Sequence, residues 1–205
     1  MKLTIELMKR LSLYLFLFLL TLQTPSLADD IRDFQIEGIS IGDSLLDYMS
    51  EEEIKIQLER NKPAYNYLTD EFGEAYLFSK FETYDRLAFK VKPNDNNYII
   101  YSIKGSISYD DKLEQCFAKQ KEIVKEFSLL YKNARKVEKT FEFPWDPTGK
   151  SKTYSIHFIF DSGDEIKVAC TQYEKSLKIK NNWADSLQIV IANKEVIAWM
   201  RKHIN

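Results

Sequence analysis

The sequence predicts an α+β domain in which an antiparallel sheet carries helices packed mainly on one face. Segments rich in aromatic and β-branched residues form two groups, three before and four after a long amphipathic segment, with short turn sequences between them. Helices separated by such runs of strands favour this architecture. A degenerate αβββ duplication is an alternative that the element order leaves open, although the two halves show no visible residue identity.

The N-terminus has the order of parts found in a secretory signal peptide. A basic pair at positions 9–10 precedes residues 11–22, of which all but two are apolar, and a Ser-Leu-Ala sequence ends at Ala28. This order predicts a signal peptide over residues 1–28 with cleavage after Ala28. The alternative is an uncleaved membrane anchor, but the apolar run is shorter than the ~20 residues that a spanning helix needs.

Residues 29–205 contain no Pro/Gly/Ser-rich linker and no low-complexity stretch. We therefore expect a single α+β domain over 29–205. Because a cleaved signal peptide is predicted before it, we expect this domain to be periplasmic or secreted and not stably inserted in a membrane. The first helix of this domain is predicted from residue 51 to about residue 60. Ser50 and Glu53 form a capping box before it, and Pro63 is expected beyond its end.

The central and C-terminal parts predict the sheet. Alternating or β-branched composition predicts strands at 75–81, 86–91, 98–109, about 135–143, 153–161, 165–174 and 186–192. Between the first three and the last four strands, a long helix carries an apolar stripe whose only polar member is Gln120. Asn193 can cap a final helix.

The two cysteines are predicted to form a disulfide. Cys116 lies on the apolar stripe of the long helix, and Cys170 shares a strand face with Ile166 and Val168. If that helix packs on that sheet, both sulfurs enter one interface, and a pair of buried cysteines in an exported chain is most simply a disulfide. Two free buried thiols are the alternative.

Charge and residue types argue against several functions. The chain has 29 Lys and Arg against 31 Asp and Glu, a formal net charge of −2, which is not the basic excess that nucleic-acid partners require. The only histidines are His157 and His203, so no nucleophile–base pair, metal site or cofactor is predicted. Residues 144–151 end like a phosphate-binding loop, but Pro144 replaces its first glycine and a strand follows, which indicates a connecting loop.

The sequence favours a binding or envelope accessory function without catalysis. Trp145 and Trp183 lie in predicted loops and are the two tryptophans expected to be exposed, where either can stack on a sugar or a partner. The partner is an unidentified protein or a small-molecule ligand. The alternative is a periplasmic hydrolase that uses carboxylates which the sequence does not locate.

Part of the chain resembles a known group of exported proteins. The run from Ile36 to Tyr48, followed by the Ser50 to Ile54 sequence, is similar to a run in small exported proteins of marine alphaproteobacteria with AT-rich genomes, of the Pelagibacter type. The helix around Cys116 and the strand around Cys170 are similar too. The resemblance implies export to the periplasm and carries no implication about activity.

Overall fold

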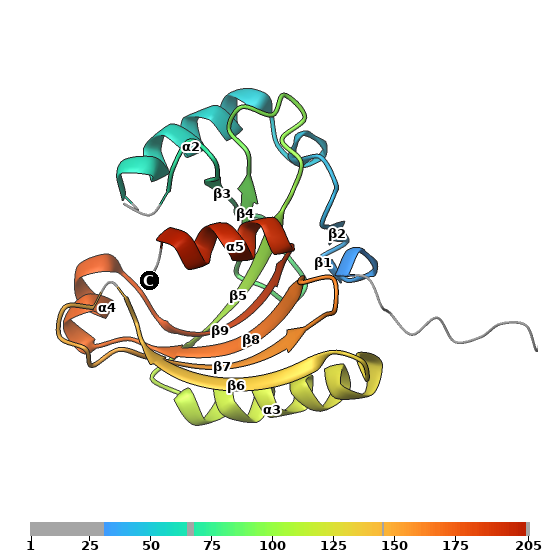
Figure 1. Ribbon diagram of the computed structural model, residues 1–205. Helices are drawn as coiled ribbons and strands as arrows, with labels where there is room; N and C mark the ends of the chain where they lie inside the picture. The colour runs from blue at the N-terminus through green and yellow to red at the C-terminus, as the bar shows by residue number, and fades with distance from the viewer. Residues whose placement is uncertain (1–30, 65–67, 145, 204–205) are drawn as a thin grey trace, which may run out of the picture.

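The computed structural model describes residues 31–64, 68–144 and 146–203 (Figure 1). The predicted signal peptide, its cleavage site after Ala28, and Trp145 lie outside the described residues. The elements in chain order are η1 (Ile31–Asp33), β1 (Gln35–Ile36), β2 (Ile39–Ser40), η2 (Leu45–Asp47), α2 (Glu51–Ala64), β3 (Gly73–Leu77), β4 (Arg86–Val91), β5 (Ser102–Asp110), α3 (Leu113–Leu130), β6 (Arg135–Glu142), β7 (Lys152–Ile159), β8 (Glu165–Gln172), α4 (Lys175–Asn181), β9 (Asp185–Ala192) and α5 (Lys194–His203).

The large sheet is antiparallel throughout and has seven strands in the order β3-β4-β5-β9-β8-β7-β6. The α+β class and the antiparallel sheet are therefore confirmed. Strands β3 to β5 form one meander and β6 to β9 another, and the two join where β5 pairs with β9. Because α2 packs on β3 whereas α3 packs across β8, β9 and β5, the two halves are not covered alike, and the duplication stays a prediction.

One face of the sheet is apolar and is covered by α3, which Figure 1 shows along the outer side of β6 to β9. Apolar residues of β8 and β9 on this face are buried, as are Cys116, Ile123 and Phe127 on the helix, whereas the edge strand β6 is largely exposed. Gln120, the polar member of the stripe, donates through Nε2 to the carbonyl oxygens of Tyr154 and Val168, at 2.9 and 3.0 Å. A buried amide is tolerated there because its donors are satisfied.

The predicted disulfide is present. Cys116 and Cys170 are bonded with their Cα atoms 6.1 Å apart, and both residues are fully buried. The bond joins α3 to β8 in the middle of the apolar layer, as the two sequence patterns indicated.

Helix α2 covers one edge of the sheet. The capping box is confirmed, since Glu53 N donates to Ser50 Oγ at 3.3 Å and Ser50 N donates to Glu53 Oε2 at 3.0 Å. The helix continues to Ala64, so the expected end of the helix before Pro63 is wrong. Pro63 is tolerated because it lies in the last turn, where its missing N–H removes only one helical hydrogen bond. The side chain of Gln57 donates to Tyr76 O and accepts from Tyr76 N, and so occupies hydrogen-bonding groups of the edge strand β3.

Helix α5 lies on the side of the sheet opposite α3 (Figure 1). Asn193 caps it as predicted, accepting from Val196 N at 3.1 Å. Val196 and Trp199 form a second, smaller apolar cluster with Leu68 and Phe72. Helix α4 was not predicted from the sequence, because none of its residues is buried and it therefore carries no apolar stripe.

Candidate ligand-binding groove

The sheet face opposite α3 holds a groove of about 740 Å³. Residues of β3, β4, β5, β9, β8 and β7 line its floor. Met200 of α5 and residues between Leu177 and Ala184 at the end of α4 border it. Side chains alternate between the two faces of a strand, so the residues between the buried apolar ones point into this groove. The volume is typical of a site for a small molecule.

Two lysines face each other across the middle of the floor. Lys104 on β5 lies opposite Val190 on β9, and Val190 lies opposite Lys167 on β8. Directly opposed residues point to the same face, so the two lysines flank the valine with their backbones two strand spacings, about 10 Å, apart. Both side chains line the groove.

A buried carboxylate compensates one of these lysines. Glu74 on β3 is ion-paired with Lys90, and its Oε1 lies 3.4 Å from Lys104 Nζ. The Tyr76 hydroxyl also donates to Glu74 Oε1 at 2.7 Å. Burial raises the pKa of the Glu74 carboxyl, but Lys104 and Lys90 more than reverse this and hold the pKa well below its usual range. Glu74 is therefore ionised and its charge is already shared by two lysines.

Lys167 has no such partner. Within the described residues it forms no ion pair. Burial lowers its pKa to about 8; the nearby Lys104 and Lys90 also lower this pKa, whereas Glu165, which is paired with His157, raises it. Burial also lowers the pKa of Lys104, although Glu74 opposes this. Both residues are half-buried, and the direction of the two pKa shifts means that burial and the nearby positive charges outweigh the carboxylates beside these ammonium groups.

The groove as a whole has an excess of positive charge. Among the described residues that line it, five are basic and two are acidic: Arg86, Lys90, Lys104, Lys167 and Lys180 against Glu74 and Asp85. The sign is opposite to that of the whole chain, whose formal net charge is −2.

A serine, a histidine and a glutamate meet on the same face, at the strand β7. His157 Nε2 lies 2.9 Å from Ser155 Oγ, and His157 Nδ1 lies 2.6 Å from Glu165 Oε1. The sequence predicted no such set, and the hairpin register that brings Glu165 beside His157 was the signal for it. Ser155 is only 1% exposed, however, and its hydroxyl donates to Lys139 O at 3.1 Å. With that proton donated to Lys139 O, the Ser155 hydroxyl is not donating to His157 Nε2, as the hydroxyl of an activated nucleophile would.

Aromatic side chains gather at the end of the groove near α4. The ring centroids of Phe143, Tyr173 and Trp183 lie 5.0 to 5.8 Å from one another, and all three residues line the groove. Phe78, 68% exposed, follows the edge strand β3, and Phe141, 38% exposed, lies on the opposite edge strand β6; both also line the groove. Apolar surface therefore borders a floor that is mainly polar.

The structure places one of the two predicted binding tryptophans in this groove. Trp183 lines it, but it is half-buried against Phe143 and Tyr173 rather than exposed as expected. Trp145 lies outside the described residues. The phosphate-loop-like stretch joins β6 to β7, as predicted, and Asp146 closes it by accepting from backbone amides within the loop.

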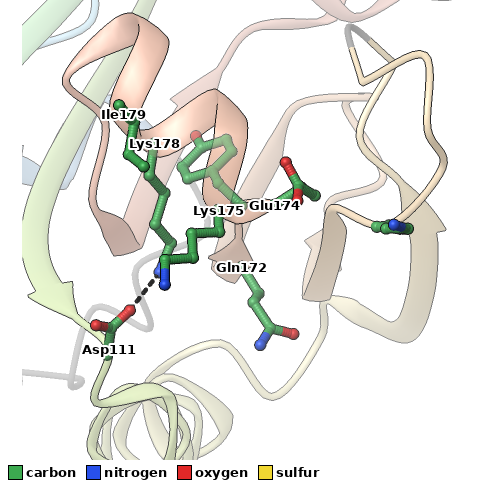
Figure 2. Close-up of a pocket in the computed structure, with 8 residues that line it drawn as sticks. Asp111, Gln172, Glu174, Lys175, Lys178 and Ile179 are labelled. Atoms are coloured by element: carbon green, nitrogen blue, oxygen red, sulfur yellow. Dashed lines mark hydrogen bonds and ion pairs between the residues drawn. The ribbon is translucent and has the colours of Figure 1, made fainter.

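A second pocket of about 560 Å³ lies beside α4 (Figure 2). Lys178 Nζ in this pocket lies 2.8 Å from Asp111 Oδ1 and 2.7 Å from Asp185 Oδ2. Two carboxylates already neutralise this ammonium group, and the other two lysines that line the pocket, Lys150 and Lys175, are exposed to solvent.

The lysines of the floor are candidate functional residues that the sequence did not reveal. Within residues 31–64, 68–144 and 146–203, no group of three or more His, Cys, Asp or Glu side chains is placed to hold a metal ion. No helix in the same part of the chain is long and apolar enough to cross a membrane.

Comparisons with protein-family models, with curated proteins and with solved structures find no match to this chain.

Proposed function

We propose that this protein is an exported, non-catalytic binding protein whose groove takes a small-molecule ligand. One observation carries the proposal: a groove of about 740 Å³ has two half-buried lysines on its floor, of which Lys104 shares one carboxylate with Lys90 and Lys167 forms no ion pair within the described residues. Partly desolvated charge of one sign in a concave site attracts a ligand of the opposite sign.

Two features support export. The sequence order at the N-terminus is typical of a cleaved signal peptide. The Cys116–Cys170 disulfide belongs to an oxidising environment, such as the periplasm or the cell exterior.

Ligand capture tests this proposal directly. Immobilised protein is incubated with periplasmic extract, washed, denatured, and the released small molecules are identified by mass spectrometry. We expect at least one compound to be enriched on the wild type and reduced on Trp183→Ala, because Trp183 lines the groove. Enrichment of the same compounds on both proteins, or of none on either, would contradict binding in the groove.

A hydrolase is the second candidate, favoured by the distances within Ser155, His157 and Glu165. The burial of Ser155 and its bond to Lys139 O argue against a nucleophilic role. A fluorophosphonate probe separates the two candidates, because it labels activated serines. Binding without turnover predicts no labelling; labelling of the wild type that Ser155→Ala abolishes would favour the hydrolase.

A further inference from the structure

The polar floor of the groove extends well beyond the two lysines. Four residues from Lys104 along β5, or about 13 Å at 3.3 Å per residue, a row of hydroxyl groups crosses four strands. Its members are Ser108 on β5, Ser186 on β9, Thr171 on β8 and Thr153 on β7, each opposite the next. All four residues line the groove.

A further hydroxyl lies between the lysines and this row. Ser106, opposite Gln188 on β9, is 4% exposed, and its Oγ is the only buried side-chain polar atom without a hydrogen-bond partner in the part of the chain that the structure describes. A buried polar atom without a partner has lost its hydrogen bonds to water and gained none in the protein, which is unfavourable. A ligand that brings hydroxyl groups to this floor can supply hydrogen-bond partners. An alkyl chain lying on it would desolvate the polar groups of the floor without forming hydrogen bonds to them.

The borders of the groove suit a ligand with flat, weakly polar faces. Trp183, Phe143 and Tyr173 form one end, and Phe78 and Phe141 stand at opposite edges. Large, rigid aromatic side chains give contact area at low entropic cost. The aromatic side chains can contact the flat face of a ligand ring. The hydroxyl and ammonium groups of the floor suit a ligand that carries hydroxyl groups around its ring and a negative charge at one end.

We propose that the groove binds a small polyhydroxylated carboxylate, of the chemical class of the acidic sugars. The carboxylate lies between Lys104 and Lys167, whose flexible side chains can converge on one anion, and the hydroxyl groups extend over Ser106 toward the hydroxyl row. The aromatic side chains contact the C–H face of the ring. This inference rests on the proposed binding function and specifies the ligand class for the same site.

Four probes measured by isothermal titration calorimetry at low ionic strength test the ligand class: galacturonate, galactose, acetate and decanoate. Galactose lacks the carboxylate, acetate lacks the hydroxyl groups, and decanoate replaces them with an alkyl chain. We expect galacturonate to bind at least tenfold more tightly than each of the others. Equal binding of galactose or acetate, tighter binding of decanoate, or no binding of galacturonate would each overturn the proposal.

Groove variants locate the bound anion. Lys104→Met and Lys167→Met are each expected to weaken galacturonate binding at least tenfold, while galactose binding changes little. Lys125→Met removes the same charge from an exposed position on α3, on the other face of the sheet, and should leave binding unchanged. Thermal melts of all three variants check that each is folded. Galacturonate binding that ignores both groove lysines would overturn the assignment of the carboxylate.

Failure of this inference can be told apart from failure of the proposed function. If galacturonate does not bind but the capture experiment enriches a compound that Trp183→Ala loses, the groove binds a ligand of another class. If neither experiment shows binding that depends on the groove, the binding function itself is wrong.

Discussion

Removal of the Cys116–Cys170 disulfide offers a quantitative test of how the fold is held together. The double variant Cys116→Ala with Cys170→Ala breaks the link between α3 and β8. The two cysteines are 54 positions apart, and in the chain-entropy model closing a loop of this length stabilises the folded state by about 4 kcal/mol. A loss of this size is a large fraction of the roughly 5–15 kcal/mol that stabilises a typical domain.

The assay is urea and thermal unfolding followed by tryptophan fluorescence and circular dichroism. For a domain of this size about 4 kcal/mol corresponds to a fall in Tm of roughly 8–16 °C. The wild type in the presence of a reductant is the matched control, because it loses the cross-link and keeps both sulfur atoms. The double variant should be slightly less stable than the reduced wild type, since its alanines also leave a small space in a fully buried layer.

The reasoning would be refuted if the oxidised and reduced wild type unfolded within about 1 kcal/mol of each other. That result would mean that packing of α3 on the sheet, and not the cross-link, determines the stability.

Three further predictions concern the groove, the sheet edge and the N-terminus. Lys167→Met should raise Tm at pH 7 while it weakens anion binding, because the folded state then no longer holds a half-buried ammonium group beside other lysines. In the wild type the folded pKa of Lys167, about 8, lies below its unfolded value. The free energy of unfolding of the wild type should therefore increase as pH rises from about 8 to above 10. A pH series in which Lys167→Met shows the same increase would contradict this. Gln57→Leu should lower the free energy of unfolding by about 1–3 kcal/mol, because it removes the side-chain partners of the Tyr76 N–H and C=O groups. Urea melts measure this change. A variant that unfolds like the wild type would show that water replaces both bonds. N-terminal sequencing of protein from the periplasm should begin at Asp29, and an intact Met1 in the membrane fraction would exclude cleavage after Ala28.

Local sequence patterns were sufficient for most of the elements. The alternation of Tyr154, Ile156 and Phe158 predicted β7, and Asn193 predicted the start of α5, because period and capping act within a few residues. The disulfide was also within reach, since both cysteines occupy apolar positions in their own elements.

The groove could not be predicted in the same way. Lys104 and Lys167 are neighbours only because β9, the last strand in the chain, lies between β5 and β8. The local sequence around each lysine predicts only a solvent-exposed residue on the polar side of a strand. The order of strands is a long-range property of the fold, and no periodicity near either lysine indicates it.

The floor of the groove is where the sequence works against stability. Elsewhere the capping box of α2, the N-cap of α5, the alternation of side chains and the covered edge at β3 all favour the same fold, as expected of a sequence that specifies one structure. Lysines on a merely solvated sheet face would be exposed and would titrate normally. Lys90 is instead 9% exposed, and burial lowers the pKa values of Lys104 and Lys167. Conflicts of this kind are expected at functional sites, because a ligand that neutralises the charge recovers the stability that the free protein lacks.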